Sequence, residues 1–191
     1  MSIELYLVAL ILAFVVLYYT VPSMVGAYIR FRGTRVVTCP ETRKTVAVEV
    51  DAGHAALTAT FTHRDLRLQS CTRWPERRDC GQDCLLQVEL SPEDCLVRTI
   101  LTSWYHGKHC VSCGTQFGAI RWSDHKPGLL SPEGQTVDWG EIPPEKVPEM
   151  LATHFPVCWD CLIVETFCRA HPELIVDRSQ IAAGMHLDLI A

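Results

Sequence analysis

Short motifs of nucleotide-binding and hydrolytic enzymes are missing from this chain of 191 residues. The patterns G-x-x-x-x-G-K, G-x-G-x-x-G, H-E-x-x-H and G-x-S-x-G do not occur, and neither does the C-x-x-C-H of covalently attached haem. Repeats of fixed period and low-complexity tracts are also absent. The sequence therefore indicates neither nucleotide binding nor serine chemistry, identifies no small-molecule substrate, and favours a non-catalytic protein.

The sequence also lacks the excess of positive charge that nucleic-acid-binding domains usually carry. Its formal net charge is -5 at pH 7. Residues 30–78 hold 10 basic and 5 acidic side chains, whereas residues 124–191 hold 4 basic and 11 acidic ones. We therefore predict no nucleic-acid partner, and a membrane-proximal basic region that rests against anionic lipid head groups.

Charged residues are absent from the 25 positions between Leu5 and Ile29. As a helix this segment would reach about 37 Å, which is enough to cross the hydrocarbon core of a bilayer. It is apolar on every face, whereas a surface helix of a soluble protein has a polar face. No basic residue precedes it and no A-x-A site follows it, so a retained anchor fits better than a cleaved signal peptide. The sequence predicts a transmembrane anchor at residues 1–30.

Basic residues flank this segment only on its C-terminal side, where Arg30, Arg32 and Arg35 stand. The positive-inside rule then predicts a single-pass protein with its N-terminus outside and its C-terminal domain in the cytoplasm. Because the cytoplasm keeps thiols reduced, ten cysteines there point to metal ligands rather than disulfides. The reverse topology would place disulfide-bonded cysteines outside the cytoplasm.

The rest of the chain predicts an α+β fold, a small cysteine-rich, metal-stabilised domain with short antiparallel strands and several helices. We expect a β-rich subdomain at residues 31–90, a subdomain with a helix and the sharper cysteine cluster at residues 91–178, and a tail at residues 179–191. Alternating and apolar patterns predict short strands at residues 46–50, 57–61, 66–69, 119–122 and 136–139. Capping signals and helical spacing predict helices at residues 91–105, 143–152 and 161–170.

Two C-x-x-C pairs form the sharper cysteine cluster, Cys110 with Cys113 and Cys158 with Cys161. Two such pairs can surround one ion with a tetrahedron of thiolates, which suits Zn²⁺ and, less often, iron. The first pair, followed by Gly114, resembles the knuckle of zinc-ribbon and treble-clef domains, and the second leads into a helix as the last pair of a treble clef does. The resemblance covers roughly residues 110–169, and it implies a four-cysteine metal site.

The spacing between the two pairs departs from the familiar pattern. Cys113 and Cys158 are separated by 44 residues, whereas the usual separation is about 15–20. The inserted segment is therefore expected to form a small subdomain of its own. The alternative is two independent pairs of buried or redox-active thiols, although no βαβ pattern of the thioredoxin kind surrounds either pair.

A second cluster, whose spacing matches no standard site, contains Cys39, Cys71, Cys80 and Cys84. Cys80 and Cys84 are predicted to lie one helical turn apart on the same face, where both can bind one ion. These four residues are predicted to hold a second zinc ion. An iron–sulfur cluster is the alternative because its ligand spacing is more varied, and a set of small core side chains is a third interpretation.

The remaining cysteines, Cys95 and Cys168, are expected to pack in the core. His106 and His109 precede Cys110 closely enough to replace a ligand or to hydrogen-bond a thiolate. The other histidines have no ligand spacing, and their acidic neighbours are expected by chance on a polar surface.

Together these patterns predict a single-pass, membrane-anchored metal-binding protein with one or two thiolate-bound structural zinc ions. It would serve as a non-catalytic accessory or assembly subunit of a larger membrane complex, with lipid and other membrane-protein subunits as partners. The physical reason is that a thin core of short strands and loops needs the folding free energy of metal binding. The alternative is an iron–sulfur or thiol-based electron-transfer subunit of a membrane redox complex.

Overall fold

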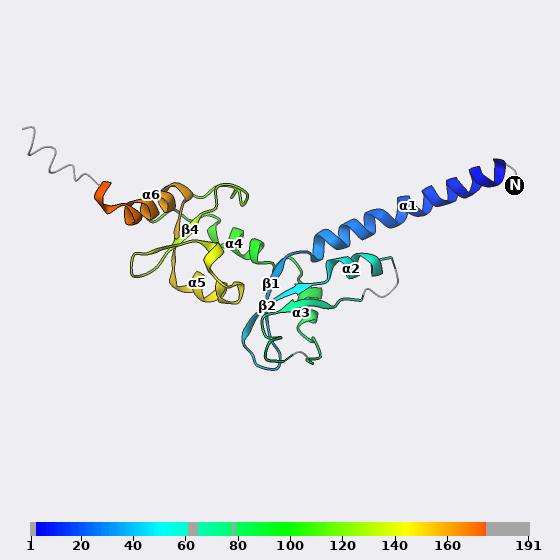
Figure 1. Ribbon diagram of the computed structural model, residues 1–191, viewed down its shortest axis with the longest axis horizontal. Coiled ribbons are helices and arrows are strands. Elements are labelled where there is room, and N and C mark those ends of the chain that lie inside the picture. The colour runs from blue at the N-terminus through cyan, green and yellow to red at the C-terminus, as the bar shows by residue number, and fades with distance from the viewer. Residues whose placement is uncertain (1–2, 61–64, 78, 175–191) are drawn as a thin grey trace, which may run out of the picture. The chain divides into compact units, whose positions relative to one another are not determined.

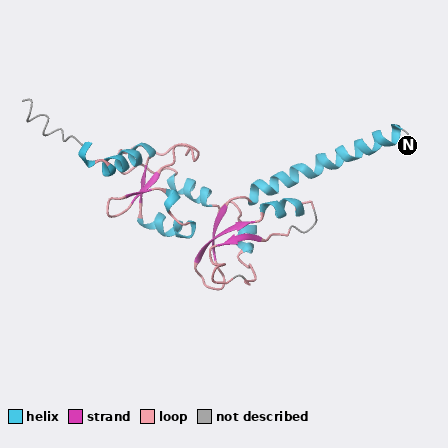
Figure 2. Ribbon diagram, viewed as in Figure 1, coloured by secondary structure: helices cyan, strands magenta, loops and turns pink. Residues whose placement is uncertain are grey.

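The computed structural model describes residues 3–60, 65–77 and 79–174. Its helices and short antiparallel strands form the predicted α+β fold with a long N-terminal helix (Figures 1 and 2). The chain divides into two compact units: unit 1 contains Met1–Ser103 and Pro143–Pro148, and unit 2 contains Trp104–Ile142 and Glu149–Ala191. The predicted subdomain boundaries stay predictions, and the predicted tail lies outside the described residues.

The first helix of unit 1, α1, spans Ile3–Phe31 and has 29 residues. It is long and apolar enough to cross a membrane, and the most apolar part of it is not covered by the rest of the protein. At 1.5 Å per residue the helix measures about 44 Å, compared with about 30 Å for the hydrocarbon core of a bilayer. The last turns of α1 therefore extend past the length that a membrane requires.

Helix α2 (Ala52–Thr58) packs against α1. Its small side chains Ala52, Ala55 and Ala56 are buried, as is Ala27 in the last part of α1. The Ser23 hydroxyl donates a hydrogen bond of 3.3 Å to the carbonyl of Ala59, which fixes the position of the contact along α1. The last turns of α1 thus belong to the folded part of unit 1 (Figure 1).

The strand predicted at residues 57–61 is wrong for the described part of that range, because Leu57 and Thr58 end α2. The Asp51 side chain accepts a hydrogen bond of 2.8 Å from the backbone N–H of His54 and so caps the start of this helix. An alanine-rich segment behind an aspartate cap favours helix over strand.

The sheet of unit 1 has three antiparallel strands in the order β1-β2-β3, with bounds Thr34–Thr38, Thr45–Val50 and Leu68–Cys71. Strand β2 is the predicted strand, and Val46, Val48 and Val50 on it are buried. Helix α3 (Leu85–Leu90) contributes the fully buried Val88 to the same core. Cys39 and Cys84 are part of this core, and Cys71 at the end of β3 packs against it.

Arg35 on β1 is fully buried and caps the C-terminal end of α1. Its guanidinium donates hydrogen bonds to the carbonyls of Phe31 at 2.6 Å and Gly33 at 2.9 Å, and its Nε donates to the carbonyl of Pro92 at 3.2 Å. The last carbonyls of a helix lack intrahelical partners and carry partial negative charge, which a buried cation satisfies. Arg35 therefore joins α1 rigidly to the domain.

Helix α4 spans Val97–Tyr105, so the prediction that this helix begins at residue 91 is wrong. The carbonyl of Cys95 accepts a hydrogen bond of 2.8 Å from the N–H of Val36, and Leu96 forms a bridge with Arg35. These contacts hold the segment before Val97 along the edge of β1. Pairing with a neighbouring strand overrides the local capping signal.

Unit 2 contains a small antiparallel sheet in the order β5-β4-β6, with bounds Gly128–Leu130 for β4, Thr136–Val137 for β5 and Phe155–Val157 for β6. The strand predicted at residues 119–122 is wrong, since only Arg121 forms an isolated bridge there, with His125. The remaining helices and 3₁₀ turns are α5 (Val147–Thr153), α6 (Trp159–Ala170), η1 (Trp139–Glu141), η2 (Pro144–Lys146) and η3 (Pro172–Leu174).

Buried groups around Gly128 hold the sheet of unit 2 to its surroundings. The hydroxyl of Tyr105, which is fully buried, donates a hydrogen bond of 2.6 Å to the Gly128 carbonyl. The indole N–H of Trp139 donates in turn to the Tyr105 hydroxyl at 3.0 Å. A Cβ at Gly128 would lie 2.8 Å from the methyl carbons of Leu162 on α6, so any larger residue requires Leu162 to shift.

Candidate metal centre

The first cysteine pair lies in a tight turn between Cys110 and Thr115. The N–H of Gly114 donates to the Cys110 carbonyl at 2.8 Å, and the N–H of Cys110 donates to the Thr115 carbonyl at 2.9 Å. Gly114 has a φ of 76°, a left-handed conformation that glycine adopts without strain. The turn directs the sulfurs of Cys110 and Cys113 to the same side, as the resemblance to a zinc knuckle implies.

The second pair lies where β6 leads into α6. Cys158 is the N-cap residue of α6, and Cys161 stands in its first turn. The N–H of Cys158 donates a hydrogen bond of 3.3 Å to Cys110 Sγ, and the N–H of Val111 donates to the Pro156 carbonyl at 3.0 Å. Backbone contacts therefore bring the two pairs together despite the 44 residues between them.

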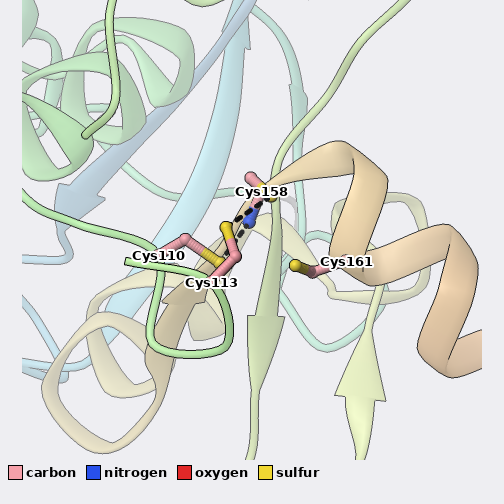
Figure 3. Close-up of side chains that lie close together, drawn as sticks. All are labelled: Cys110, Cys113, Cys158 and Cys161. Carbon is pink, nitrogen blue, oxygen red and sulfur yellow. Dashed lines mark hydrogen bonds between the residues drawn. The ribbon is translucent and has the colours of Figure 1, made fainter. Parts of the chain in front are cut away.

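All four sulfur atoms lie within 4.8 Å of one another (Figure 3). The distance between Cys113 Sγ and Cys158 Sγ is 3.7 Å. A tetrahedron of thiolates with Zn–S bonds of about 2.3 Å has sulfurs about 3.8 Å apart, so this pair already has the required separation. The four cysteines of the sharper cluster can hold one metal ion.

Hydrogen bonds to sulfur lower the pKa of the first two thiols. The hydroxyl of Thr115, 3.3 Å from Cys113 Sγ, is the main reason that the pKa of Cys113 falls to about 6. Burial opposes ionisation of Cys110, but the backbone N–H groups of Cys158, Cys113 and Ser112 outweigh it, and the pKa of Cys110 is lowered. Both thiols are prepared to act as thiolate ligands.

The other two thiols have the opposite tendency. Burial raises the pKa of Cys158 and, more strongly, that of Cys161, whose other neighbouring thiols add to the effect. Four thiolates this close repel one another, so they cannot all ionise without a cation between them. A divalent ion removes this penalty because it stabilises every thiolate that it binds.

No protein-family model matches the chain. Searches of curated proteins and of solved structures likewise give no significant match. The interpretation of the site therefore depends on its own geometry.

The donor set fits a thiophilic ion. Cys110 is almost fully buried, Cys158 and Cys161 are half-buried, and Cys113 is exposed. Four sulfur ligands in tetrahedral reach are typical of Zn²⁺ and of iron. All four positions are supplied by the protein, which is typical of a structural ion, since a catalytic zinc keeps one position for water.

Cys80 and Cys84 do not lie on one helix, contrary to the prediction from the sequence. Helix α3 begins only after Cys84, and Gln82 has a φ of 56°, which interrupts any helix between the two cysteines. The prediction that they share one helical face is therefore wrong. Whether the second cluster binds a metal stays a prediction at this point. Among the described residues, only the four cysteines of the sharper cluster form a group of three or more potential ligands whose atoms all lie within 4.8 Å of one another.

The leftover cysteines lie apart from the sharper cluster. Cys95 is partly buried and packs against the core of unit 1, as expected. Cys168 is half-buried on α6. Thr115 is a functional neighbour that the sequence analysis missed. A hydroxyl residue two positions after the second cysteine of a C-x-x-C-G turn is the signal that identifies it.

Proposed function

We propose that the protein is a single-pass membrane protein whose cytoplasmic domain is stabilised by a structural zinc ion at Cys110, Cys113, Cys158 and Cys161. We further propose that it is a non-catalytic accessory or assembly subunit of a larger membrane complex. A long apolar helix and a four-cysteine cluster that could bind a metal fit a metal-binding membrane protein. The convergence of the four sulfurs is the observation that carries the proposal.

A structural role for the ion follows from the thin core beside it. The buried core around the cluster consists of only Cys110, Val157 and Leu162 among the described residues, with five partly buried hydrophobic residues packed against them. So little apolar burial leaves unit 2 dependent on another source of stability. Zinc bound by four thiolates supplies several kcal/mol of folding free energy in small domains of this kind.

The accessory role is supported by apolar side chains that nothing covers. Ile163, Val164 and Phe167 on α6 are each about half exposed, at 46%, 58% and 52%. Exposed apolar groups on one helix are typical of surfaces that contact another protein. The long, uncovered α1 offers a second apolar surface within the bilayer for other subunits.

The cytoplasmic orientation is supported by the arginines after the span. Arg30 and Arg32 are exposed at the end of α1, where they remain available for the anionic inner leaflet. A membrane-impermeant thiol reagent tests this orientation in intact cells. We expect labelling of the exposed Cys113 only after lysis and removal of metal; labelling of intact cells would contradict the proposal.

Metal analysis of the full-length protein in detergent tests the site. Cys110→Ser and Cys161→Ser should each remove one metal equivalent and lower the free energy of unfolding of unit 2. Cys168→Ser, on the same helix as Cys161, should change neither. Colourless protein that releases zinc to a chelator supports the proposal. Brown protein that contains iron and sulfide would instead support the electron-transfer alternative.

A further inference from the structure

Three cysteines of the second cluster converge on the core of unit 1 from different elements. Cys39 follows β1, Cys71 ends β3, and Cys84 is the N-cap residue of α3. Cys39 and Cys84 are 9% and 6% exposed, and Cys71 packs against the same core. The thiols of Cys39 and Cys84, which are 45 residues apart in the sequence, therefore lie in the same buried region.

The turn at Cys39 has the same backbone hydrogen bonds as the turn at Cys110. In the first, the N–H of Arg43 donates to the Cys39 carbonyl at 2.7 Å, and the N–H of Cys39 donates to the Lys44 carbonyl at 2.9 Å. The turn at Cys110 has these two bonds at the same spacing, at 2.8 Å and 2.9 Å. Arg43, with a φ of 57°, takes the place of Gly114.

Cys39 thus lies in a knuckle in which Thr42 stands where the second cysteine of the pair would be. Arg73 Nη1 donates a hydrogen bond of 3.2 Å to the sulfur of Cys39. This turn supplies one sulfur ligand instead of two, so a complete tetrahedron needs the others from elsewhere.

Side-chain contacts bring α3 and the end of β3 to this knuckle. Gln87, one turn after Cys84, accepts from the N–H of Thr38 at 3.1 Å and donates to its carbonyl at 2.6 Å. Thr38 directly precedes Cys39. Because Arg73 stands two residues after Cys71, its contact with Cys39 Sγ likewise ties the end of β3 to the turn.

The loop that carries Cys80 is attached to the same place. Arg77 Nη1 lies 3.7 Å from a carboxylate oxygen of Glu41 in the knuckle, and its Nε lies 3.8 Å from Asp79, the residue before Cys80. The Gln82 side chain accepts a hydrogen bond of 2.9 Å from the N–H of Leu68 on β3. Both sides of Cys80 are therefore held near the other three cysteines.

We propose that Cys39, Cys71, Cys80 and Cys84 bind a second thiophilic divalent cation, of which Zn²⁺ is the representative, in unit 1. This site goes beyond the proposed function, because it is built from different residues in a different unit. The sulfurs of these four described cysteines lie farther apart than those of the first site, which all fall within 4.8 Å of one another, so binding of the ion has to draw them together. Arg73 offsets part of the negative charge that four thiolates leave on the complex.

A buried donor without a partner lies in the same core. The indole N–H of Trp74, three residues after Cys71, is buried and has no hydrogen-bond partner in the described part of the chain. Trp74 packs against the core that contains Cys39 and Cys84, and its N–H is a donor available to a thiolate of the proposed site.

Zinc and cobalt stoichiometry of the full-length protein in detergent tests the proposal. We expect two equivalents in the wild type, one in Cys80→Ser and one in Cys113→Ser, each with the thiolate-to-cobalt bands of the remaining site. Cys80→His should keep the second equivalent, because imidazole replaces a thiolate as ligand but does not replace a packing thiol. Cys95→Ser, a partly buried cysteine of the same core, should keep both.

The outcomes separate this site from the first one. A wild type with one equivalent, lost in Cys113→Ser and kept in Cys80→Ser, would overturn the second site and leave the proposed function intact. Loss of metal only in Cys80→Ser would overturn the first site and support the second. If Cys80→Ser unfolds, Cys80→His decides: retention of two equivalents supports the proposal, and retention of one overturns it.

Discussion

Hydrogen bonds and burial act in opposite directions on the thiols of the metal site in unit 2. Cys113 is exposed, so its pKa of about 6 reflects the Thr115 hydroxyl and backbone rather than burial. Cys161, a few ångströms away, has a raised pKa because burial and its neighbours disfavour charge. The charged form is therefore favoured at Cys113 and disfavoured at Cys161, and binding of a divalent ion releases protons from the thiols that it binds.

Thr115→Val should shift the acid-induced loss of metal to higher pH. The lowered pKa keeps Cys113 deprotonated until the pH falls to about 6, and loss of the hydroxyl raises that pKa, so protons compete with the metal earlier. The affinity at neutral pH should fall roughly tenfold, as for other residues that support a ligand. A pH titration with a zinc-sensitive dye measures both effects.

Thr153→Val is the matched control, because the Thr153 hydroxyl bonds to the Glu149 carbonyl within α5 and not to a thiol. It should leave the pH midpoint unchanged. An identical midpoint in Thr115→Val and the wild type would show that the hydroxyl does not support Cys113.

At the scale of helices and strands, the sequence predicted the features that depend on neighbouring residues. The two C-x-x-C pairs were found because a metal-binding turn needs only neighbouring residues, and β2 was found from its alternating valines. The turn at residues 92–95, which separates Ser91 from α4, was missed because the contacts of Cys95 and Leu96 are with β1, some 60 residues earlier. The order of the strands around Gly128 likewise depends on contacts between distant residues, which no local pattern contains.

Gly128→Ala should weaken metal binding without touching a ligand. The new Cβ would lie 2.8 Å from the methyl carbons of Leu162 on α6 and 3.1 Å from the Val137 carbonyl oxygen, so the Leu162 side chain must shift, and α6 shifts with it because Leu162 is buried. Because Cys158 and Cys161 begin α6, this movement displaces two of the four sulfurs. We expect unit 2 to lose about 1–3 kcal/mol in denaturant unfolding, with weaker zinc retention against a chelator.

Gly118→Ala provides the comparison, since a Cβ there meets nothing within 4 Å and the backbone is not left-handed. It should resemble the wild type in both measurements. Equal stability of the two alanine variants would mean that α6 and β4 can separate without cost.

At the scale of the whole molecule, α1 has two environments along its length. Most of its side chains are exposed in the way that a lipid-facing helix requires, whereas Ala27 and Phe31 are buried in unit 1. A bilayer core needs about 20 residues of helix, which leaves roughly nine for the domain. The contact of Ser23 with Ala59 marks where the folded part begins. The apolar segment that is long enough to span a membrane and the first helix of the folded domain are therefore one continuous helix.

Two truncations should separate the roles of this helix. Removal of residues 1–22 keeps the turns that α2 covers, so the product should leave the membrane fraction and retain the metal and the stability of unit 1. Removal of residues 1–29 also deletes Ser23 and the buried Ala27, and unit 1 should lose about 2 kcal/mol or more because the alanines of α2 become exposed. Flotation on a lipid gradient measures membrane association, and denaturant unfolding measures stability. Equal stability of the two products would contradict this division of α1. Flotation of the protein that lacks residues 1–22 would also contradict it, and would assign the basic surface beyond Arg30 a membrane-binding role of its own.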